Sequence, residues 1–240
     1  YPFQWMAARV QDGLSGFGRY FTGIDRLRDE IDSLQAENES LREALNDAVL
    51  IRQEDEWLYR YLSMKEERDD WSLCAATVTA VSWSDGYAVG LTLNKGSSSG
   101  IRTGMPVVTE AGLVGVVGEC GLTFCKVRTI LDTAHSAGAS DVRSGENGMA
   151  EGSFSALREG KLTFRYLPAE ADIREGDVVV TSGSGSVYPY GIPIGTAETV
   201  SANAYARTTE AVLTPFVSFD TIKQVMIVTD YEHTTGEVNP

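Results

Sequence analysis

Apolar residues recur at alternating steps of three and four positions between Ile24 and Ala48. A stripe with this spacing, held for about four heptads, predicts a helix that buries one narrow face against a second helix in a coiled coil. Isoleucine at the a positions with leucine at the d positions favours two parallel strands. The predicted dimer seam consists of Ile24, Leu27, Ile31, Leu34, Asn38, Leu41, Leu45 and Ala48.

Asn38 is the single polar residue among the a positions of this seam. Two facing asparagines can hydrogen-bond only when the helices are parallel and in register, so Asn38 favours a parallel homodimer. Glu37 and Arg42 stand at positions that can form an ion pair across the same interface. The alternative is a single amphipathic helix that lies on the rest of the chain.

The segments on either side of the seam depart from the heptad pattern. Segment 1–23 contains four glycines, each of which weakens a helix by up to about 1 kcal/mol relative to alanine, so we expect it to be frayed or hinged. Beyond Arg52 the apolar residues form a wider, aromatic stripe, which suits docking onto a globular body better than a narrow seam. This stripe consists of Trp57, Leu58, Tyr61, Leu62 and Met64.

After Trp71 the pattern changes to short strand-like segments separated by Gly-, Ser- or Asp-rich turns. An all-β body follows, and barrels or sandwiches are the architectures that hide its sheet edges. The candidate strands are Ala75–Ser82, Tyr87–Leu93, Pro106–Thr109, Leu113–Glu119, Lys126–Leu131, Lys161–Leu167, Val178–Thr181, Ile194–Val200, Ala211–Phe216 and Ile222–Thr229.

One stretch of the β region occurs twice. Ile101-Arg-Thr-Gly-Met-Pro-Val-Val-Thr109 aligns with Ile173-Arg-Glu-Gly-Asp-Val-Val-Val-Thr181, and each copy is followed by a second glycine-rich signature. In each copy an Ile anchors a core, a Gly permits a turn and a β-branched run forms a strand. Two copies at this spacing predict two related β domains with a boundary in Ser140–Gly152. It stays open whether the C-terminal strands return to complete the first domain.

Charge and cysteine content exclude several classes of function. The net charge of −14 and the pI of 4.6 argue against nucleic acid as a partner, because phosphate backbones are repelled. Cys74, Cys120 and Cys125 lack the spacing of a zinc or thioredoxin-like site. Cys120 and Cys125 could face each other across a hairpin, either as a disulfide or as buried free thiols.

The sequence shows no convincing catalytic, cofactor or metal site. Asp132 and His135 could serve as orienting carboxylate and base, with Ser182, Ser184 or Ser186 as nucleophile. We expect instead an Asx turn at Asp132 and an exposed loop at His135. Gly96-Ser-Ser-Ser-Gly100 matches the letters of a nucleophile elbow, but no helix can follow it, so we expect a hairpin loop.

Two signatures in this order resemble those of the rod shape-determining protein MreC family of bacteria. The first is Leu93-Asn-Lys-Gly-Ser-Ser-Ser-Gly-Ile-Arg-Thr-Gly-Met-Pro-Val-Val, with Gly112-Leu-Val-Gly-Val-Val after it. The second is Thr181-Ser-Gly-Ser-Gly-Ser-Val-Tyr-Pro-Tyr-Gly-Ile-Pro-Ile-Gly195. The resemblance implies a coiled coil followed by two β barrels in a chymotrypsin-like arrangement without a catalytic triad.

The resemblance also implies a location and partners. It implies an extracytoplasmic protein, anchored to the cell membrane by an N-terminal transmembrane helix that would precede Tyr1. Such a protein is a non-catalytic scaffold of the cell-elongation machinery, which dimerises or assembles further and contacts a penicillin-binding transpeptidase and other membrane components. The alternatives are a trypsin-like serine hydrolase and a periplasmic adaptor subunit of an export system, although adaptors use a helical hairpin.

These expectations divide the chain into five parts. They are a membrane-proximal segment at 1–23, the coiled-coil helix at 24–66, a first β domain at 72–145, a second β domain at 146–232 and a disordered tail at 233–240.

Overall fold

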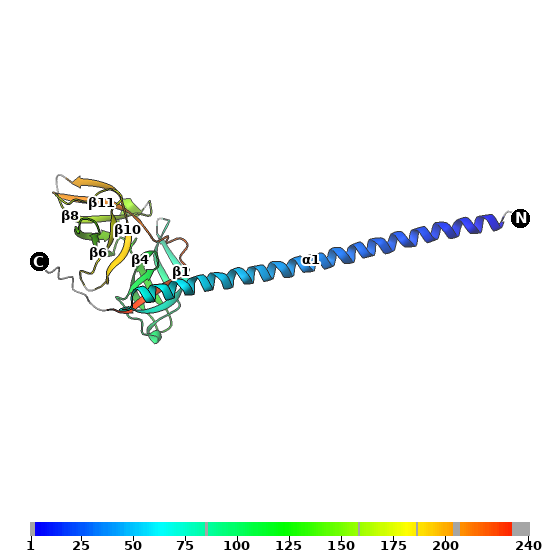
Figure 1. Cartoon of the computed structure of the whole chain (residues 1–240), viewed down its shortest axis with the longest axis horizontal. Coiled ribbons are helices and arrows are strands. Elements are labelled where there is room, and N and C mark those ends of the chain that lie inside the picture. The colour runs from blue at the N-terminus through cyan, green and yellow to red at the C-terminus, as the bar shows by residue number, and fades with distance from the viewer. Residues whose placement is uncertain (1–2, 85, 158, 186, 204–206, 232–240) are drawn as a thin grey trace. The chain divides into compact units, whose positions relative to one another are not determined.

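The computed structural model describes residues 3–84, 86–157, 159–185, 187–203 and 207–231 of the chain. One long helix is followed by two closed barrels of six strands each (Figure 1). The prediction of a mainly β fold with one long N-terminal helix and two small barrels is therefore confirmed. The predicted tail at 233–240 lies outside the described residues.

Helix α1 spans Phe3–Glu67 and begins well before the predicted coiled coil. The expected fraying or hinge in segment 1–23 is wrong for the backbone, which is helical from Phe3 onward. Once a helix is nucleated, each added residue gains a hydrogen bond, and this outweighs the modest cost of scattered glycines. The chain divides after Trp57 into two units, and residues 58–240 form a unit that contains the last turns of α1 and both barrels.

The first barrel is closed by strands from both ends of the β region. Its neighbour order is β1-β12-β3-β4-β5-β2, and every pairing is antiparallel. The strands are β1 (Ser72–Ser84), β2 (Tyr87–Leu93), β3 (Pro106–Thr109), β4 (Gly112–Cys120), β5 (Cys125–Thr129) and β12 (Gln224–Asp230). The C-terminal strand β12 thus completes the first barrel, which settles the possibility left open by the sequence.

The second barrel is formed by consecutive strands in the order β10-β11-β8-β7-β6-β9. These strands are β6 (Ser136–Asp141), β7 (Asn147–Glu151), β8 (Leu162–Pro168), β9 (Val178–Ser182), β10 (Tyr190–Asn203) and β11 (Thr208–Pro215). A short helix α2 (Phe154–Leu157) connects β7 to β8. If β3 is taken as equivalent to β9 and β4 to β10, the strands follow one another in the same order around both barrels. In this comparison β12 of the first barrel corresponds to β6 of the second. The second barrel is therefore a related unit inserted between β5 and β12.

The predicted boundary between the β domains is wrong. The segment Ser140–Gly152 is not a linker, because most of it forms the hairpin of β6 and β7, and β6 also pairs with β9. The connection between the barrels lies instead at residues 130–135, so the predicted limits of 72–145 and 146–232 both shift. Small and polar residues in this hairpin resemble a linker in composition, although Ala137 and Ala139 are fully buried.

The two copies of the internal repeat fold into the same turn. The backbone N–H of Gly104 donates to the carbonyl oxygen of Val117 at 2.8 Å, and that of Gly176 donates to Ala197 at 2.8 Å. Both glycines have a positive φ, 91° and 93°, which a residue with a Cβ rarely adopts. The common geometry supports the interpretation of the repeat as two copies of one β unit.

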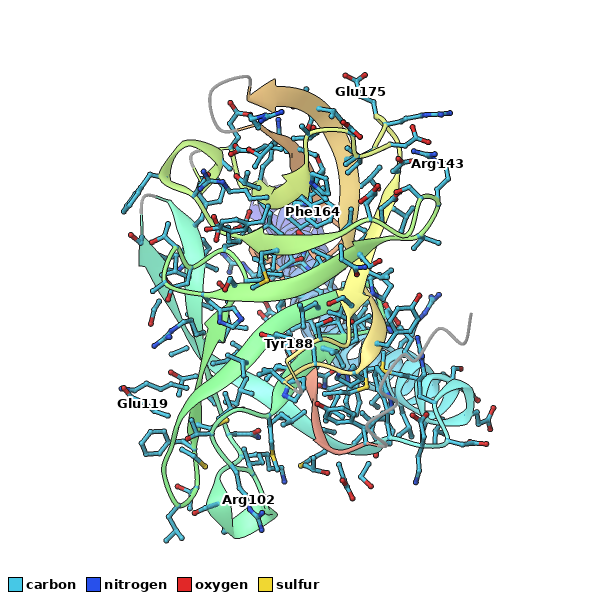
Figure 2. The ribbon with its side chains drawn as sticks, turned by 90° about the vertical axis from the view of Figure 1, so that its left-hand side faces the viewer. Arg102, Glu119, Arg143, Phe164, Glu175 and Tyr188 are labelled. Carbon is cyan, nitrogen blue, oxygen red and sulfur yellow. The ribbon has the colours of Figure 1, made fainter. Side chains whose placement is uncertain are left out.

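The two turns differ in the side chain that closes them. In the first, the backbone N–H of Arg102 lies 3.2 Å from the sulfur of Met105, and in the second the N–H of Arg174 donates to Oδ2 of Asp177 at 2.7 Å. Arg102 and Glu175, which mark the two turns, lie at opposite ends of the two-barrel body (Figure 2).

The interior of the barrels is one continuous apolar core. Leu91 and Ile227 fill the first barrel, and Phe164 lies fully buried within the second (Figure 2). Tyr188 is also buried and lies near the middle of the two-barrel body (Figure 2). Because the core runs through both barrels, they behave as one packed body that the last turns of α1 can dock against.

Candidate functional site

The predicted dimer seam lies on α1, and its described large apolar side chains are exposed. Ile31, Leu34, Leu41 and Leu45 are between 50% and 64% exposed, and Asn38 and Ala48 are exposed as well. Ile24 and Leu27 lie on the same helix, but their side chains are not among those described. Exposed apolar side chains at this spacing form a stripe suited to a second helix.

The last turns of α1 dock onto the first barrel through only part of the predicted aromatic stripe. Tyr61 and Met64 pack against the core, and the Tyr61 hydroxyl donates to the carbonyl oxygen of Leu73 at 3.3 Å. Leu58 and Leu62 remain nearly half exposed. The prediction that this stripe docks is therefore confirmed for Tyr61 and Met64 and wrong for Leu58 and Leu62, because one face of a helix can contact the barrel at a time.

Arg68, just after α1, links the helix end to the second barrel. Its Nη2 donates to the carbonyl oxygen of Gly191 at 3.3 Å, and its guanidinium lies 5.0 Å from the ring centre of Trp71. The backbone N–H of Trp71 in turn donates to the carbonyl oxygen of Arg68 at 3.0 Å. Sequence reasoning missed this role, since an Arg between acidic residues gives no local sign of a partner more than a hundred residues away.

The two barrels meet at glycines where an added Cβ atom would clash with a backbone oxygen. A Cβ on Gly112 of β4 would lie 2.2 Å from the carbonyl oxygen of Pro193 of β10, and one on Gly152 would lie 2.2 Å from that of Leu131. Gly112 opens the glycine-rich signature that follows the first repeat copy, but its contact with Pro193 could not be inferred from the sequence. These contacts fix the relation of the barrels through backbone atoms.

The Asp, His and Ser residues considered for a catalytic triad have other partners. The Asp132 carboxylate accepts from the backbone N–H of Ala134 at 2.9 Å, which confirms the predicted Asx turn, and it pairs with Arg128 at 3.3 Å. The Nε2 atom of His135 shares a hydrogen bond with the hydroxyl of Tyr188. His135 is thus partly buried, and the expectation of an exposed loop residue is wrong because the second barrel covers it.

The serines considered as nucleophiles are not joined to His135 by a hydrogen bond in the described part of the chain. The Ser182 hydroxyl accepts from the backbone N–H of Ser184 at 3.3 Å, and Ser186 lies outside the described residues. Among the residues described, no hydrogen bond joins the Asp132 carboxylate to the His135 ring or the ring to Ser182. Ser97–Ser99 form a 3₁₀ turn between β2 and β3, as expected for a loop and unlike a nucleophile elbow.

The electrostatics of His135 and Tyr188 reflect their burial. Burial, reinforced by the positive charge of Arg128, lowers the pKa of His135 below its ordinary value, although Asp132 opposes this. Burial also raises the pKa of the Tyr188 hydroxyl. Both groups are therefore held neutral near pH 7, which suits a hydrogen bond within the junction of the barrels.

Arg143 on the β6–β7 turn clamps the second repeat turn. Its Nε and Nη2 donate to the two carboxylate oxygens of Asp177 at 2.8 and 2.7 Å, and its Nη1 donates to Asp172 at 2.9 Å. Hydrogen bonding to Arg143 holds the pKa of Asp177 below its ordinary value. A bidentate pair of this kind gives geometric rigidity, and the described residues around Met105 form no such pair in the first repeat turn.

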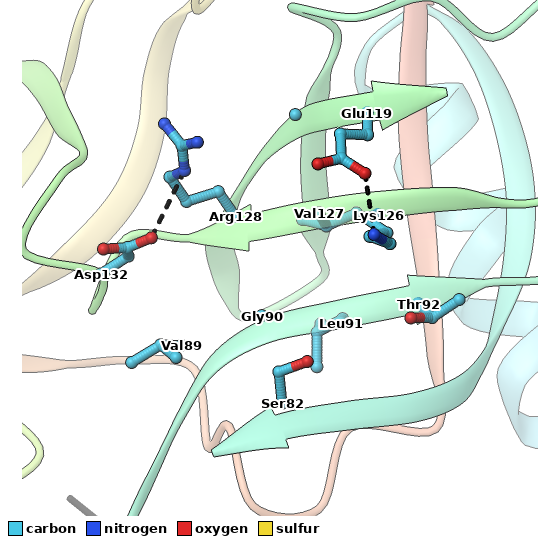
Figure 3. A pocket seen from close by; sticks show the side chains of 11 residues that line it. Ser82, Val89, Gly90, Leu91, Thr92, Glu119, Lys126, Val127, Arg128 and Asp132 are labelled. Carbon is cyan, nitrogen blue, oxygen red and sulfur yellow. Dashed lines mark hydrogen bonds and ion pairs between the residues drawn. The ribbon is translucent and has the colours of Figure 1, made fainter. Parts of the chain in front are cut away.

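An open groove crosses the outer face of the first barrel (Figure 3). Gly90 and Gly118 line it and contribute no side chain, and the ion pairs Glu119–Lys126 and Arg128–Asp132 border it. Two acids balance two bases, so the groove carries no uncompensated charge that would select an anion or a cation. Within the described part of the chain, no three His, Cys, Asp or Glu side chains gather closely enough to hold a metal ion.

No helix among the described residues contains a stretch long and apolar enough to cross a membrane.

A family model, curated relatives and solved structures all point to one protein family. A family model described as rod shape-determining protein MreC, barrel core, matches residues 80–229. The chain is 27% identical to the cell shape-determining protein MreC of Escherichia coli (strain K12), over 86% of this chain and 57% of that protein. It is 28% identical to MreC of Geobacillus stearothermophilus, over 87% of this chain and 77% of that protein. The chain thus spans little more than half the length of the Escherichia coli relative.

Solved structures share the fold. One described as MreC has a TM-score of 0.65 at 27% identity, over 74% of this chain and 98% of that one. MreC from Pseudomonas aeruginosa has a TM-score of 0.58 at 28% identity, over 65% of this chain and 99% of that one. Two more distant structures, at 22% and 15% identity, share the fold with TM-scores of 0.58 and 0.50.

Proposed function

The chain belongs to the rod shape-determining MreC family, and from this membership we propose that it is a non-catalytic scaffold of the bacterial cell-elongation machinery. In this proposal the chain dimerises through α1, works outside the cytoplasm and organises peptidoglycan-synthesis enzymes by protein–protein contacts. The segment 1–23 is then the part nearest the membrane.

The observation that carries the proposal is the exposed apolar stripe on α1. Ile31, Leu34, Leu41 and Leu45 are each at least half exposed in the single chain. Burying a fully exposed side chain of this kind is worth about 1.5–3 kcal/mol, so completing the burial of these half-exposed residues on both helices would stabilise a dimer by roughly half that amount per residue. Asn38, in the middle of the stripe, favours two parallel helices in register.

The proposed location and partner are supported by proteins of the same fold. One of the distant structures is described as the major periplasmic domain of the cell shape-determining filament MreC. The other is described as a complex between penicillin-binding protein PBP2 and MreC from Helicobacter pylori. These are likenesses of fold at low identity, and we extend the extracytoplasmic location and a transpeptidase partner to this chain by analogy.

The absence of catalysis in this proposal is supported by the partners of the candidate triad. Asp132 is engaged by Ala134 and Arg128, and His135 by Tyr188. A base that activates a serine has to face it within hydrogen-bonding reach. The competing hydrolase hypothesis predicts turnover of an acyl ester that is lost on replacing His135 with Ala. Turnover with that dependence would refute the scaffold proposal.

Sedimentation equilibrium tests the dimer. We expect the wild-type chain to sediment as a dimer and Leu34→Glu/Leu41→Glu to sediment as a monomer. The matched control is Ala36→Glu/Ser40→Glu, which adds the same charge to exposed positions off the seam and should remain a dimer. If wild type and seam variant sediment as the same species, the seam does not mediate association.

A binding measurement tests the scaffold role. The purified chain, immobilised through its C-terminus, should retain the purified extracytoplasmic part of a penicillin-binding transpeptidase from the same cell. An unrelated penicillin-binding enzyme that acts in cell division serves as the control and should bind more weakly. Equal binding of both, or of neither, would contradict the proposed partner class.

A further inference from the structure

Cys120 and Cys125 face each other directly across the β4–β5 hairpin. They are partners in the antiparallel register of the two strands. One residue beyond them, the backbone N–H of Gly121 donates to the carbonyl oxygen of Phe124 at 2.9 Å. Hydrogen-bonded and non-hydrogen-bonded pairs alternate along an antiparallel ladder, so the two cysteines occupy a non-hydrogen-bonded pair.

That position suits a covalent link. The Cα atoms of a non-hydrogen-bonded pair are typically about 4.5 Å apart, and a disulfide accepts Cα separations of about 4.4–6.8 Å. Directly opposite residues also point their side chains to the same face of the sheet. We propose that Cys120 and Cys125, which the structure holds as free thiols, are a disulfide-forming pair that locks the β4–β5 hairpin under oxidising conditions.

The surroundings of the two thiols set the order of the reaction. Cys125 is fully buried, whereas Cys120 is partly exposed and lies with its sulfur 3.2 Å from the carbonyl oxygen of Ile101. Burial raises the pKa of the Cys125 thiol to about 11, so it is the poorer first nucleophile. Cys120 therefore reacts first with an external oxidant, and Cys125 closes the bond.

The reaction is a thiol–disulfide exchange with a disulfide-bearing oxidant such as oxidised glutathione. The Cys120 thiolate attacks one sulfur of the oxidant, which forms a mixed disulfide and releases one glutathione thiolate. The Cys125 thiolate then attacks the Cys120 sulfur and releases the second. Two protein thiols are oxidised by two electrons, the oxidant is reduced to two thiols, and the two protons pass to them.

The hairpin is already held in place for this closure. The backbone N–H groups of Ser97 and Ser98 donate to the carbonyl oxygens of Gly121 and Leu122 at 2.9 and 3.0 Å. The tip between the cysteines presents Leu122, 71% exposed, and Phe124, 46% exposed. Closing the pair therefore adds a covalent link to a hairpin whose apolar tip is already held by hydrogen bonds, and it is independent of the dimer seam on α1.

Cys74 on β1 is the competitor for this bond. It is partly buried, and its charge contributes to raising the pKa of Cys125, so it lies near enough to interact electrostatically. It pairs with Ile227 of β12 and has no register partner on β5. The strand register thus selects Cys120 over Cys74 as the partner of Cys125.

Peptide mapping of the full chain tests the proposal. The reduced protein is incubated with oxidised glutathione under native conditions, its free thiols are blocked, and it is digested with chymotrypsin, which cleaves after Phe124 between the two cysteines. We expect two peptides joined through Cys120 and Cys125, an intact mass lower by two hydrogen atoms, and one remaining thiol at Cys74. Cys74→Ser should give the same link.

The control variant is Cys120→Ser, which keeps a hydroxyl near the Ile101 oxygen and is expected to fold, as circular dichroism can verify. It should form no internal disulfide. Three free thiols in the wild type after oxidation would overturn the proposal. So would a glutathione adduct that persists on Cys120, or a link that includes Cys74.

Discussion

Gly112 and Pro193 approach so closely that a Cβ on the glycine would lie 2.2 Å from the proline carbonyl oxygen. Real Cβ atoms do not come this near to a backbone oxygen. Gly112 also has φ at +150°, a conformation that residues with side chains rarely adopt. The strands β4 and β10, which are equivalent in the two barrels, therefore meet at a point where only glycine fits.

Replacing Gly112 with Ala is expected to loosen the junction of the barrels. The added methyl group has to displace backbone rather than a flexible side chain, and overpacking of this kind costs about 1–3 kcal/mol in addition to the backbone strain. Urea-induced unfolding, followed by circular dichroism, measures the loss of stability.

Gly104→Ala is the matched control for this change. Gly104 also has a positive φ, 91°, but nothing lies within 4 Å of its Cβ position, so only the strain of about 1 kcal/mol applies. A Gly112 variant no less stable than the Gly104 variant would show that the close approach to Pro193 does not matter.

The strands that the sequence predicted are those with β-branched or aromatic runs, and the missed ones lack them. Strand β6 reads Ser-Ala-Gly-Ala-Ser-Asp, which resembles a linker. It becomes a strand because it pairs with β7 and β9 and buries Ala137 and Ala139 in the core, a tertiary effect that local propensity does not contain. The same holds for β7 (Asn147–Glu151), and the misplaced boundary between the barrels follows from missing these two strands.

Long-range contacts were equally hidden from the sequence. The repeat predicted two related β units, and the matching turns at Gly104 and Gly176 bear this out. Nothing in the repeat indicated that β12 closes the first barrel or that His135 meets Tyr188, because both pair residues far apart in the chain. The seam on α1, by contrast, rests on local periodicity, and its partner helix stays a prediction.

The His135–Tyr188 contact predicts a loss of stability in mild acid. His135 has its pKa lowered in the folded chain, chiefly by burial, from an ordinary value of 6.5. The unfolded chain therefore binds an extra proton below about pH 6.5, and folding stability should decrease as the pH falls through that value. The slope from one proton is at most about 1.4 kcal/mol per pH unit.

Urea unfolding at several pH values between about 5 and 8, the range in which a histidine titrates, measures this slope. His135→Gln removes the titrating group, keeps a hydrogen-bonding side chain and should flatten the dependence across the same interval. A wild-type protein whose stability does not change between pH 7 and 5.5, roughly one unit below the unfolded pKa, would contradict the assignment.

Arg68→Ala should weaken the attachment of the helix end to the two-barrel body. The variant loses the hydrogen bond to Gly191 and the stacking on Trp71, which together are worth about 1–2 kcal/mol at a partly buried site. Lys65→Ala removes the same charge from an exposed position in the last turn of α1 and should change stability by less than about 0.5 kcal/mol. If urea unfolding shows the same loss of stability for both variants, the contacts of Arg68 with Gly191 and Trp71 do not stabilise the fold.

Asn38 provides the sharpest test of the geometry of the proposed dimer. In a parallel, in-register coiled coil an a position faces itself, so Asn38→Cys should form an intermolecular disulfide under mild oxidation, with Cys120 replaced by Ser to limit other reactions. Ala36→Cys, two residues away and off the seam, should remain uncrosslinked under the same conditions. Non-reducing gel electrophoresis separates the outcomes. In an antiparallel or staggered pair the two residues at position 38 lie apart, unless position 38 is at the centre of the pair. A dimer of Asn38→Cys that forms no crosslink would therefore rule out the parallel, in-register arrangement, although the chain would still dimerise.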